Sequence, residues 1–136
     1  MMIHRATVTD LNLLMKAQQA SDIGEGSLTA FQMMEQLLDG RLEAYVYETA
    51  SSIAMLGLQV EGYNAVLGAW YREGPPASAL TELRALLERV KHVMRNRGVT
   101  HLYCLIAKSH PKHDKLVRLY ARLDFHPDLT RLSSEV

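Results

Sequence analysis

The stretch Ala65–Ala107, AVLGAWYREGPPASALTELRALLERVKHVMRNRGVTHLYCLIA, decides the fold of this chain. It opens with an apolar run, Ala65–Tyr71, which is typical of a buried strand. Arg72–Ala77 follows as a turn, and a second apolar run, His101–Ala107, ends the stretch. A helix is predicted between the two runs, over Ser78–Arg97, because its apolar residues recur at spacings of three and four. Those residues are Leu80, Leu83, Leu87, Val90 and Met94.

A strand, a crossover helix and a second strand predict a parallel βαβ unit, because parallel neighbours need a long connection of this kind. Gly98 comes directly after the helix, where a left-handed residue ends a helix at least cost. Ligands of such units bind at the carboxyl end of the first strand, beside the N–H groups that open the helix. In this chain that place is Glu73–Ala79, so the function depends on what this turn binds.

The length and the charge balance limit the classes of protein that need to be considered. A chain of 136 residues is expected to form a single domain over residues 1–136. Its 15 basic and 15 acidic residues cancel, so no overall field would steer it onto nucleic acid. Acidic residues nevertheless predominate in residues 9–64 and basic residues in residues 65–136. This asymmetry would suit an anionic ligand on the C-terminal half, or an attraction between the halves or between copies.

The chain has a single cysteine, Cys104, and therefore no internal disulfide, which favours a reducing compartment. The N-terminal sequence MMIHRATVTD contains no apolar signal core, and no run approaches the length of a membrane span. We therefore expect a cytoplasmic protein that does not bind membranes.

The N-terminal part predicts one strand followed by two helices. Ile3–Val8 reads as a strand, and Thr9 is the predicted N-cap of a helix that ends near Ala20. Thr29 and Gln32 form a T-x-x-Q capping box for a second helix, which Asp39-Gly40 ends.

Two further strands, Leu42–Thr49 and Ile53–Val60, precede the βαβ unit and are joined to it by short turns, which predicts an antiparallel meander. A last helix around Leu116–Leu123 is predicted to end at Asp124, and a short final strand to cover Leu129–Ser133. The element order is β-α-α-β-β-β-α-β-α-β. It predicts an α+β (mixed α/β) fold with a single central sheet and helices on both faces.

Three parts of the sequence resemble the GNAT superfamily of acyl-CoA-dependent N-acetyltransferases. Ile3–Asp10, IHRATVTD, is similar to the family's opening I-R-x-A-x-x-x-D. Leu67–Arg97 occupies the place of the family's fourth strand and third helix. Leu119–Pro127, LYARLDFHP, is similar to the family's L-Y-x-K-L-G-F-x-P and is the most specific of the three parts. The resemblance in element order covers nearly the whole chain.

The resemblance implies a function and a set of site residues. In the family, acyl-CoA lies between the fourth and fifth strands, here Ala65–Tyr71 and His101–Ala107. Tyr120 then matches the tyrosine that protonates the departing thiolate, and Glu73 is the candidate general base. The implied activity is transfer of an acetyl group from acetyl-CoA to an amine of unknown identity, carried by a small molecule or a protein, and a homodimer is a further expectation. The residues implied to bind the cofactor are Arg72, Gly74, Ala77, Ser78 and Ala79; no metal is implied.

The turn departs from the family pattern for a pyrophosphate-binding turn. The family has R/Q-x-x-G-x-G/A, whereas Arg72–Ala79 reads REGPPASA, with one glycine. Pro75 and Pro76 have no N–H to donate, and Glu73 adds a negative charge. The alternative function is therefore a catalytically inactive GNAT-like fold that serves as a protein-binding or assembly module, for example a phage virion or accessory protein.

Several side chains have a second interpretation. Tyr120 also fits the apolar face of its helix as a core residue, and Glu73 fits a solvated turn. His110 and His113 have a spacing that suits one metal ion, but no third ligand is evident nearby. Cys104 reads as a buried structural thiol. Trp70 would either line a pocket or pack on the helix.

A basic edge is predicted on the last helix and the loop before it. It would contact the 3′-phosphate of the cofactor or form a solvated face. Its residues are Lys108, Lys112, Lys115, Arg118 and Arg122.

Overall fold

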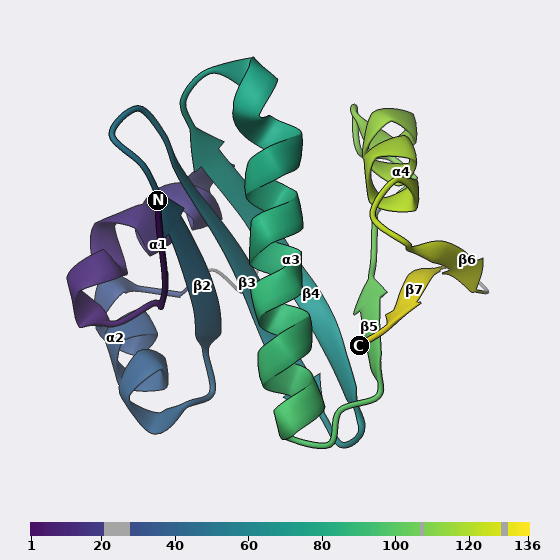
Figure 1. The fold of residues 1–136 in the computed structure, drawn as a ribbon. Helices are drawn as coiled ribbons and strands as arrows, with labels where there is room; N and C mark the ends of the chain where they lie inside the picture. The colour runs from purple at the N-terminus through teal and green to yellow at the C-terminus, as the bar shows by residue number, and fades with distance from the viewer. Residues whose placement is uncertain (21–27, 107, 129–130) are drawn as a thin grey trace.

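The computed structural model describes residues 1–20, 28–106, 108–128 and 131–136, apart from the side chains of Ala69 and Asp128. Figure 1 shows one sheet with helices packed around it. The elements are β1 (Met2–Arg5), η1 (Val8–Asp10), α1 (Leu11–Ala20), α2 (Ala30–Asp39), β2 (Glu43–Glu48), β3 (Ile53–Glu61), β4 (Asn64–Glu73), η2 (Pro76–Ser78), α3 (Ala79–Asn96), β5 (His101–Cys104), α4 (His113–Ala121), β6 (His126–Asp128) and β7 (Arg131–Glu135).

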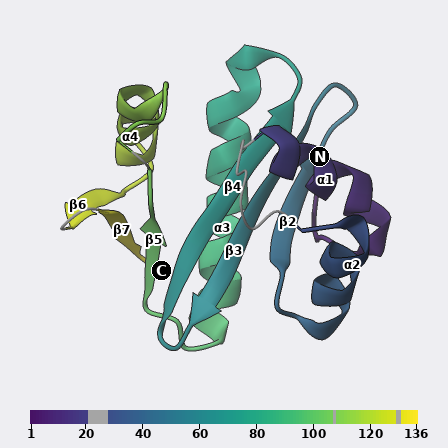
Figure 2. The ribbon, with the colours of Figure 1, turned by 180° about the vertical axis from the view of Figure 1, so that it is seen from behind.

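The strands form one sheet of mixed direction in the order β1-β2-β3-β4-β5-β7-β6. Strands β1 to β4 pair antiparallel with their neighbours, and β4 pairs parallel with β5. The predicted meander and the predicted βαβ unit are thus both confirmed, as is the α+β class with a single sheet. Helix α3 lies in front of β3 and β4 in Figure 1 and behind them in Figure 2. None of the helices in the described ranges has the length and apolarity that crossing a bilayer requires.

The C-terminal part differs from the prediction in two places. Helix α4 ends at Ala121 instead of Asp124, which lies beyond it in the left-handed conformation with φ 68°. An aspartate tolerates that conformation better than most residues, so it serves where the family has glycine. Two strands, β6 and β7, form a hairpin where one was predicted. The predicted strand Leu129–Ser133 begins in residues 129–130, which lie outside the described ones.

The caps explain where the first two helices begin. Thr29 accepts from the backbone N–H of Gln32, and Gln32 reaches back to the N–H of Thr29, as the capping box predicted. The N-cap of the first helical segment is Thr7, with Asp10 as its reciprocal partner, so the prediction of Thr9 was wrong. Sequence alone could not separate the two threonines, because each is followed by an acceptable first turn.

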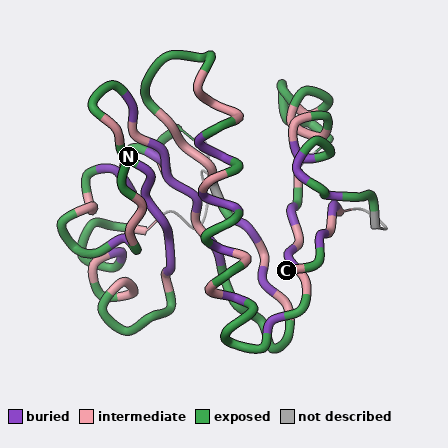
Figure 3. The backbone as a smooth tube through the Cα atoms, viewed as in Figure 1, coloured by how far each residue is buried: buried purple, intermediate pink, exposed green. Residues whose placement is uncertain are grey.

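The sheet has a separate apolar core on each face. The first cluster lies on the α3 face and takes in the buried side of α3 together with Tyr120, Leu123 and Phe125 from the C-terminal part. The second lies under α1 and α2, and Val46 and Met55 belong to it. Figure 3 shows that buried positions follow the strands and one side of α3.

Strand β4 contains a bulge that reverses its alternation. Leu58 pairs with Leu67 and Leu56 pairs with Trp70, so two steps on β3 match three steps on β4. Leu67 belongs to the core on the α3 face, and Trp70 packs on the same core although an uninterrupted strand would turn it to the other side. Tyr71 correspondingly packs on the core under α1 and α2. The bulge lies at residues 68 and 69.

Candidate functional site

The ladder between β4 and β5 is short and stops at the bulge. It runs from Asn64 opposite His101 to Leu67 opposite Cys104. Beyond Leu67, β4 continues to Glu73, and no described residue of β5 pairs with it there. Figure 1 shows β4 and β5 diverging toward their carboxyl ends. The backbone edge of β4 from Gly68 onward is therefore not covered by β5.

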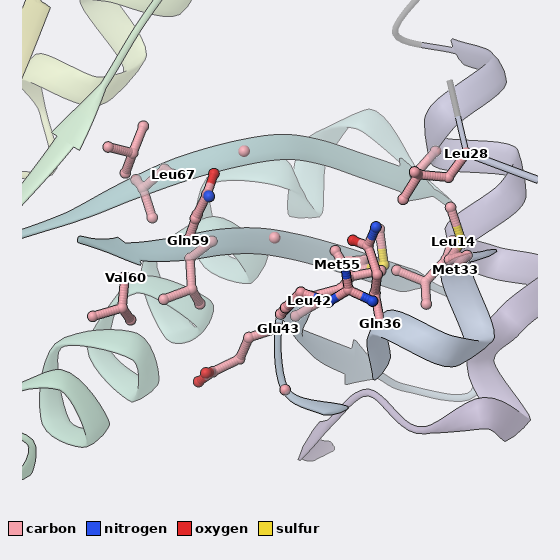
Figure 4. A pocket seen from close by; sticks show the side chains of 18 of the residues that line it. Leu14, Leu28, Met33, Gln36, Leu42, Glu43, Met55, Gln59, Val60 and Leu67 are labelled. Atoms are coloured by element: carbon pink, nitrogen blue, oxygen red, sulfur yellow. The ribbon is translucent and has the colours of Figure 1, made fainter. Parts of the chain in front are cut away.

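A pocket of about 710 Å³ lies against the other face of the sheet, under α1 and α2. Its lining includes Gly57 and Gly68, which face each other across β3 and β4 at the bulge. Figure 4 shows Leu14, Leu28 and Met33 at one end of the pocket and Val60 and Gln59 at the other. The pocket thus reaches the same point of β4 at which β5 departs.

Tyr120 of α4 meets the last residue of β5. Its side chain is 3% exposed, and its ring contacts Phe125 edge-on with 5.3 Å between centroids. Its hydroxyl makes a hydrogen bond with the Cys104 thiol. Burial, and next to it the neighbouring thiol, raises the pKa of Tyr120 well above its usual value of 10.0. The phenol therefore keeps its proton at neutral pH and can act as an acid rather than as a base.

The Arg72 side chain forms hydrogen bonds within the turn and does not extend into solvent. Its Nε donates to one oxygen of Glu82 at 2.8 Å, and a terminal nitrogen donates to the Pro75 carbonyl at 2.7 Å. The Ser78 hydroxyl donates to the second oxygen of Glu82 at 2.6 Å. Glu82 has no exposed surface and lies directly beneath the turn. The guanidinium charge is therefore balanced by a buried carboxylate.

The other predicted cofactor residues form a compact turn. The N–H of Ser78 donates to the Pro75 carbonyl at 3.2 Å, and the N–H of Ala79 donates to the Pro76 carbonyl. Gly74 has φ +144°, and a Cβ at this position would lie 2.5 Å from the Cβ of Ser52. Ala77 is in the middle of η2. Two of the N–H groups predicted to hold a pyrophosphate are thus already bonded within the turn.

The structure places Glu73 on the opposite face of the sheet from α3. Its carboxylate lies 3.7 Å from the Lys16 ammonium of α1, and its side chain is 45% exposed. The charge that was expected beside the pyrophosphate turn therefore faces α1. Gly68 and Glu73 are five residues apart on one strand, roughly 16 Å.

The structure also gives the surroundings of the predicted thiol, the two histidines and the basic edge. Burial raises the pKa of the Cys104 thiol to about 11, and the hydrogen bond with Tyr120 opposes this only in part. His113 contacts Asp114 at 2.9 Å, and His110 accepts from the N–H of Lys112. The described residues contain no group of three potential metal ligands. The five cations of the predicted basic edge are all exposed.

Sequence reasoning missed Glu82, Gly68 and the indole of Trp70. Glu82 lies four residues before Leu86, on the widened apolar stripe of α3, and a carboxylate on such a stripe was a visible sign of a buried ion pair. Gly68 has no signal beyond being a glycine within a strand. The Trp70 indole N–H is buried and has no hydrogen-bond partner among the described residues, which depends on the bulge and could not be read from sequence.

No family model matches this sequence, and no curated protein matches it either. Solved structures do match. A PaiA N-acetyltransferase from Thermoplasma acidophilum in complex with coenzyme A has a TM-score of 0.73 and 12% identity, over 100% of both chains. A probable acetyltransferase from Staphylococcus epidermidis has a TM-score of 0.77 and 10% identity, over 99% of this chain and 98% of that one.

An acetyltransferase of the GNAT family from Staphylococcus aureus has a TM-score of 0.62 and 10% identity, over 98% of this chain and 99% of that one. At such low identity the likeness concerns the fold and not the activity. The structure and these comparisons agree with the resemblance seen in the sequence: this chain has the fold of the GNAT N-acetyltransferases.

Proposed function

We propose that this protein is an acetyl-CoA-dependent N-acetyltransferase that acts on a primary amine. The observation that carries the proposal is the meeting of two features at Gly68. The β4–β5 ladder ends beside it on one side, and the pocket under α1 and α2 reaches it on the other. A thioester held along the free edge of β4 and an amine in the pocket would come together at the bulge.

The residues along β4 fit the arm of the cofactor better than those of the turn fit its pyrophosphate. The buried indole N–H of Trp70 lies just past the bulge and needs an acceptor, which an amide carbonyl of the arm would supply. At the turn, Pro75 and Pro76 have no N–H, and the charge of Arg72 is already balanced by Glu82. Each charge-assisted donor missing there weakens anion binding by about 1.5–3 kcal/mol. We therefore expect weaker binding than a glycine-rich turn would give.

In the proposed reaction, bound acetyl-CoA supplies an activated acetyl group. Backbone N–H groups of β4 near Gly68, at the edge beyond the end of the β5 ladder, would polarise the thioester carbonyl. The neutral amine attacks the carbonyl carbon and releases one proton to water. The Tyr120 hydroxyl donates its proton to the sulfur as the C–S bond breaks and then regains a proton from water. Glu73 as general base stays a prediction, and its pairing with Lys16 gives it a structural role as well.

The first experiment is a thermal unfolding scan with and without acetyl-CoA. Ligand at 100 times its dissociation constant stabilises the native state by about 2.7 kcal/mol. For a domain of this size, that should raise the midpoint by about 10 °C. No shift at millimolar acetyl-CoA would contradict the proposal and would leave the inactive binding module as the better description.

The second experiment tests the acid. Tyr120→Phe keeps the contact with Phe125 but removes the proton, so kcat should fall by about 10²- to 10⁴-fold while the thermal shift with acetyl-CoA persists. Tyr63→Phe is the matched control, because Tyr63 is 76% exposed in the β3–β4 turn. Unchanged turnover in Tyr120→Phe would remove this residue from the mechanism.

A further inference from the structure

We infer that the acceptor is an amine with one apolar body and no second positive charge. This inference rests on the function proposed above and concerns the pocket under α1 and α2. Its volume, about 710 Å³, is within the range of small-molecule sites, roughly 300–1,000 Å³. The lining decides which amine would enter it.

Most of the wall is apolar. Helices α1 and α2 contribute Leu14, Ala17 and Met33, and Met55 comes from β3 below them. Figure 4 shows Leu14, Leu28 and Met33 at one end of the pocket and Met55 nearer its middle. An apolar group placed there would gain about 25 cal/mol for each Å² removed from water. An aromatic ring or a branched alkyl chain is the body that this wall would hold best.

The polar side chains of the lining are three neutral amides, two arginines (Arg41 and Arg97) and one carboxylate. Gln18 donates to the Leu28 carbonyl and accepts from the Leu28 N–H, both at 2.7 Å. Gln36 and Gln59 also line the pocket and carry no charge. Neutral amides can orient an acceptor, but they do not balance a cation.

The one carboxylate in the described lining, Glu43, is already neutralised. It is 5% exposed, accepts from the Tyr45 hydroxyl at 2.8 Å and from Arg97 at 2.7 Å, and lies 3.6 Å from Arg5. In Figure 4 its oxygens point away from Leu14, Leu28 and Met33. The second ammonium of a diamine would thus lose its water without gaining a counter-charge from the described lining, which is strongly unfavourable.

The same lining would help the reacting nitrogen. Removal from water disfavours an ammonium ion and lowers its pKa. An amine held against apolar side chains is therefore more readily present in the neutral form that attacks a thioester. A single apolar body and an uncharged nitrogen are thus favoured by the same wall.

The test uses 2-phenylethylamine and 1,5-diaminopentane as probes of the whole chain labelled with ¹³C in the methionine methyl groups. Met33 and Met55 line the pocket, whereas Met94 is fully buried on the α3 face and serves as the internal control. 2-Phenylethylamine should shift the resonances of Met33 and Met55 and leave Met94 unchanged. Equal or stronger shifts with 1,5-diaminopentane, or no shift with 2-phenylethylamine, would overturn the inference.

A substitution then tests the charge argument. Gln59→Glu places a carboxylate in the lining and should raise the relative kcat/KM for 1,5-diaminopentane by about tenfold. Gln19→Glu adds the same charge on an exposed position of α1 outside the lining and should leave the preference unchanged. A similar effect of both variants would show that long-range charge, and not the pocket, sets the preference, and would count against the inference.

The methyl resonances report binding without turnover, so the two proposals can fail separately. Acetylation of 1,5-diaminopentane in preference to 2-phenylethylamine would overturn the acceptor class and leave the transferase intact. Methyl shifts with 2-phenylethylamine, together with no stabilisation by acetyl-CoA, would support an apolar amine site and count against the transferase.

Discussion

The buried carboxylate of Glu82 should make stability depend on pH. Burial raises its pKa, but the hydrogen bonds from Arg72, Ser78 and Ser52 outweigh burial, so the pKa lies below the usual 4.5. A carboxyl whose pKa is lowered on folding stabilises the native state above its unfolded pKa, and this stabilisation is lost as the pH falls through the folded pKa. The free energy of unfolding should therefore decrease below about pH 4.5.

Glu82→Gln should cost about 1–3 kcal/mol at pH 7 and should flatten the acid limb of the stability curve. Urea unfolding at pH 7 and pH 4 measures both effects. Glu88→Gln is the control, because Glu88 is exposed on the same helix. An unchanged pH dependence in Glu82→Gln would mean that other carboxyls cause the acid loss.

The Cys104 thiol should be inert in the folded protein. Burial raises its pKa to about 11, so at pH 8 the thiolate that reacts with alkylating reagents is a minor species. Iodoacetamide should modify it only in denaturant, which mass spectrometry can follow. Modification of the native chain at a rate near that of the unfolded chain would show that α4 opens from β5.

For single residues, the sequence predicted which side chains would be of interest better than it predicted what each of them contacts. Tyr120 and Arg72 were both singled out, and both are buried or half-buried in the structure at the expected elements. What Arg72 contacts depends on Glu82, which is ten residues further along the chain and on another element. Contacts of this kind follow from the packing of α3 against β4, which spacing along one element does not encode.

Among the elements, the turn between β4 and α3 should be the least tolerant of change. Gly74→Ala would combine a positive φ with a Cβ placed 2.5 Å from that of Ser52. Gly98→Ala is the matched control, since Gly98 also has a positive φ, +80°, but nothing lies within 4 Å of an added Cβ. The positive φ alone costs about 1–2 kcal/mol.

The free energy of unfolding of Gly74→Ala should therefore fall by the cost of the positive φ and by about 1–3 kcal/mol more because of the clash with Ser52. Chemical denaturation of the two variants measures the difference. Equal losses in both would show that Ser52 moves aside without cost, and that the turn is more pliable than its hydrogen bonds indicate.

The elements with strong periodicity were predicted well, and those without it were not. The long apolar stripe of α3 and the capping box of α2 placed both helices within a residue or two of their observed ends. The C-terminal hairpin was reduced to one strand because β6 has three residues, one of them a proline. Such a short segment has no alternation to read, and its pairing with β7 comes from the sheet.

For the whole molecule, fewer ion pairs than expected join the acidic and the basic halves of the sequence. Among ion pairs in the described ranges, only Glu43 with Arg97 links an acid of residues 9–64 to a cation of residues 65–136. Lys16 with Glu73 links the halves in the opposite sense. The attraction between halves thus explains little of the asymmetry, and the basic cations of α4 remain exposed, as an anionic ligand or partner would require.

The overall architecture followed from element order, whereas the candidate site did not. The order of the elements and the apolar runs were sufficient to predict one mixed sheet that contains a parallel βαβ unit. The pocket and the divergence of β5 from β4 depend on the position of the bulge in β4. Gly68 lies within an apolar run that is typical of a regular strand. A register shift of one residue leaves no trace in composition or periodicity over so short a length.

The bulge also determines on which face of the sheet each later side chain of β4 lies. If β4 alternated without interruption through residues 68 and 69, each of the following side chains would lie on the reverse side of the sheet. Arg72 would then face Lys16 and lose Glu82, while Glu73 would be carried toward the buried carboxylate beneath α3. The extra residue at the bulge thus determines which of two neighbouring opposite charges, Arg72 or Glu73, faces each side of the sheet.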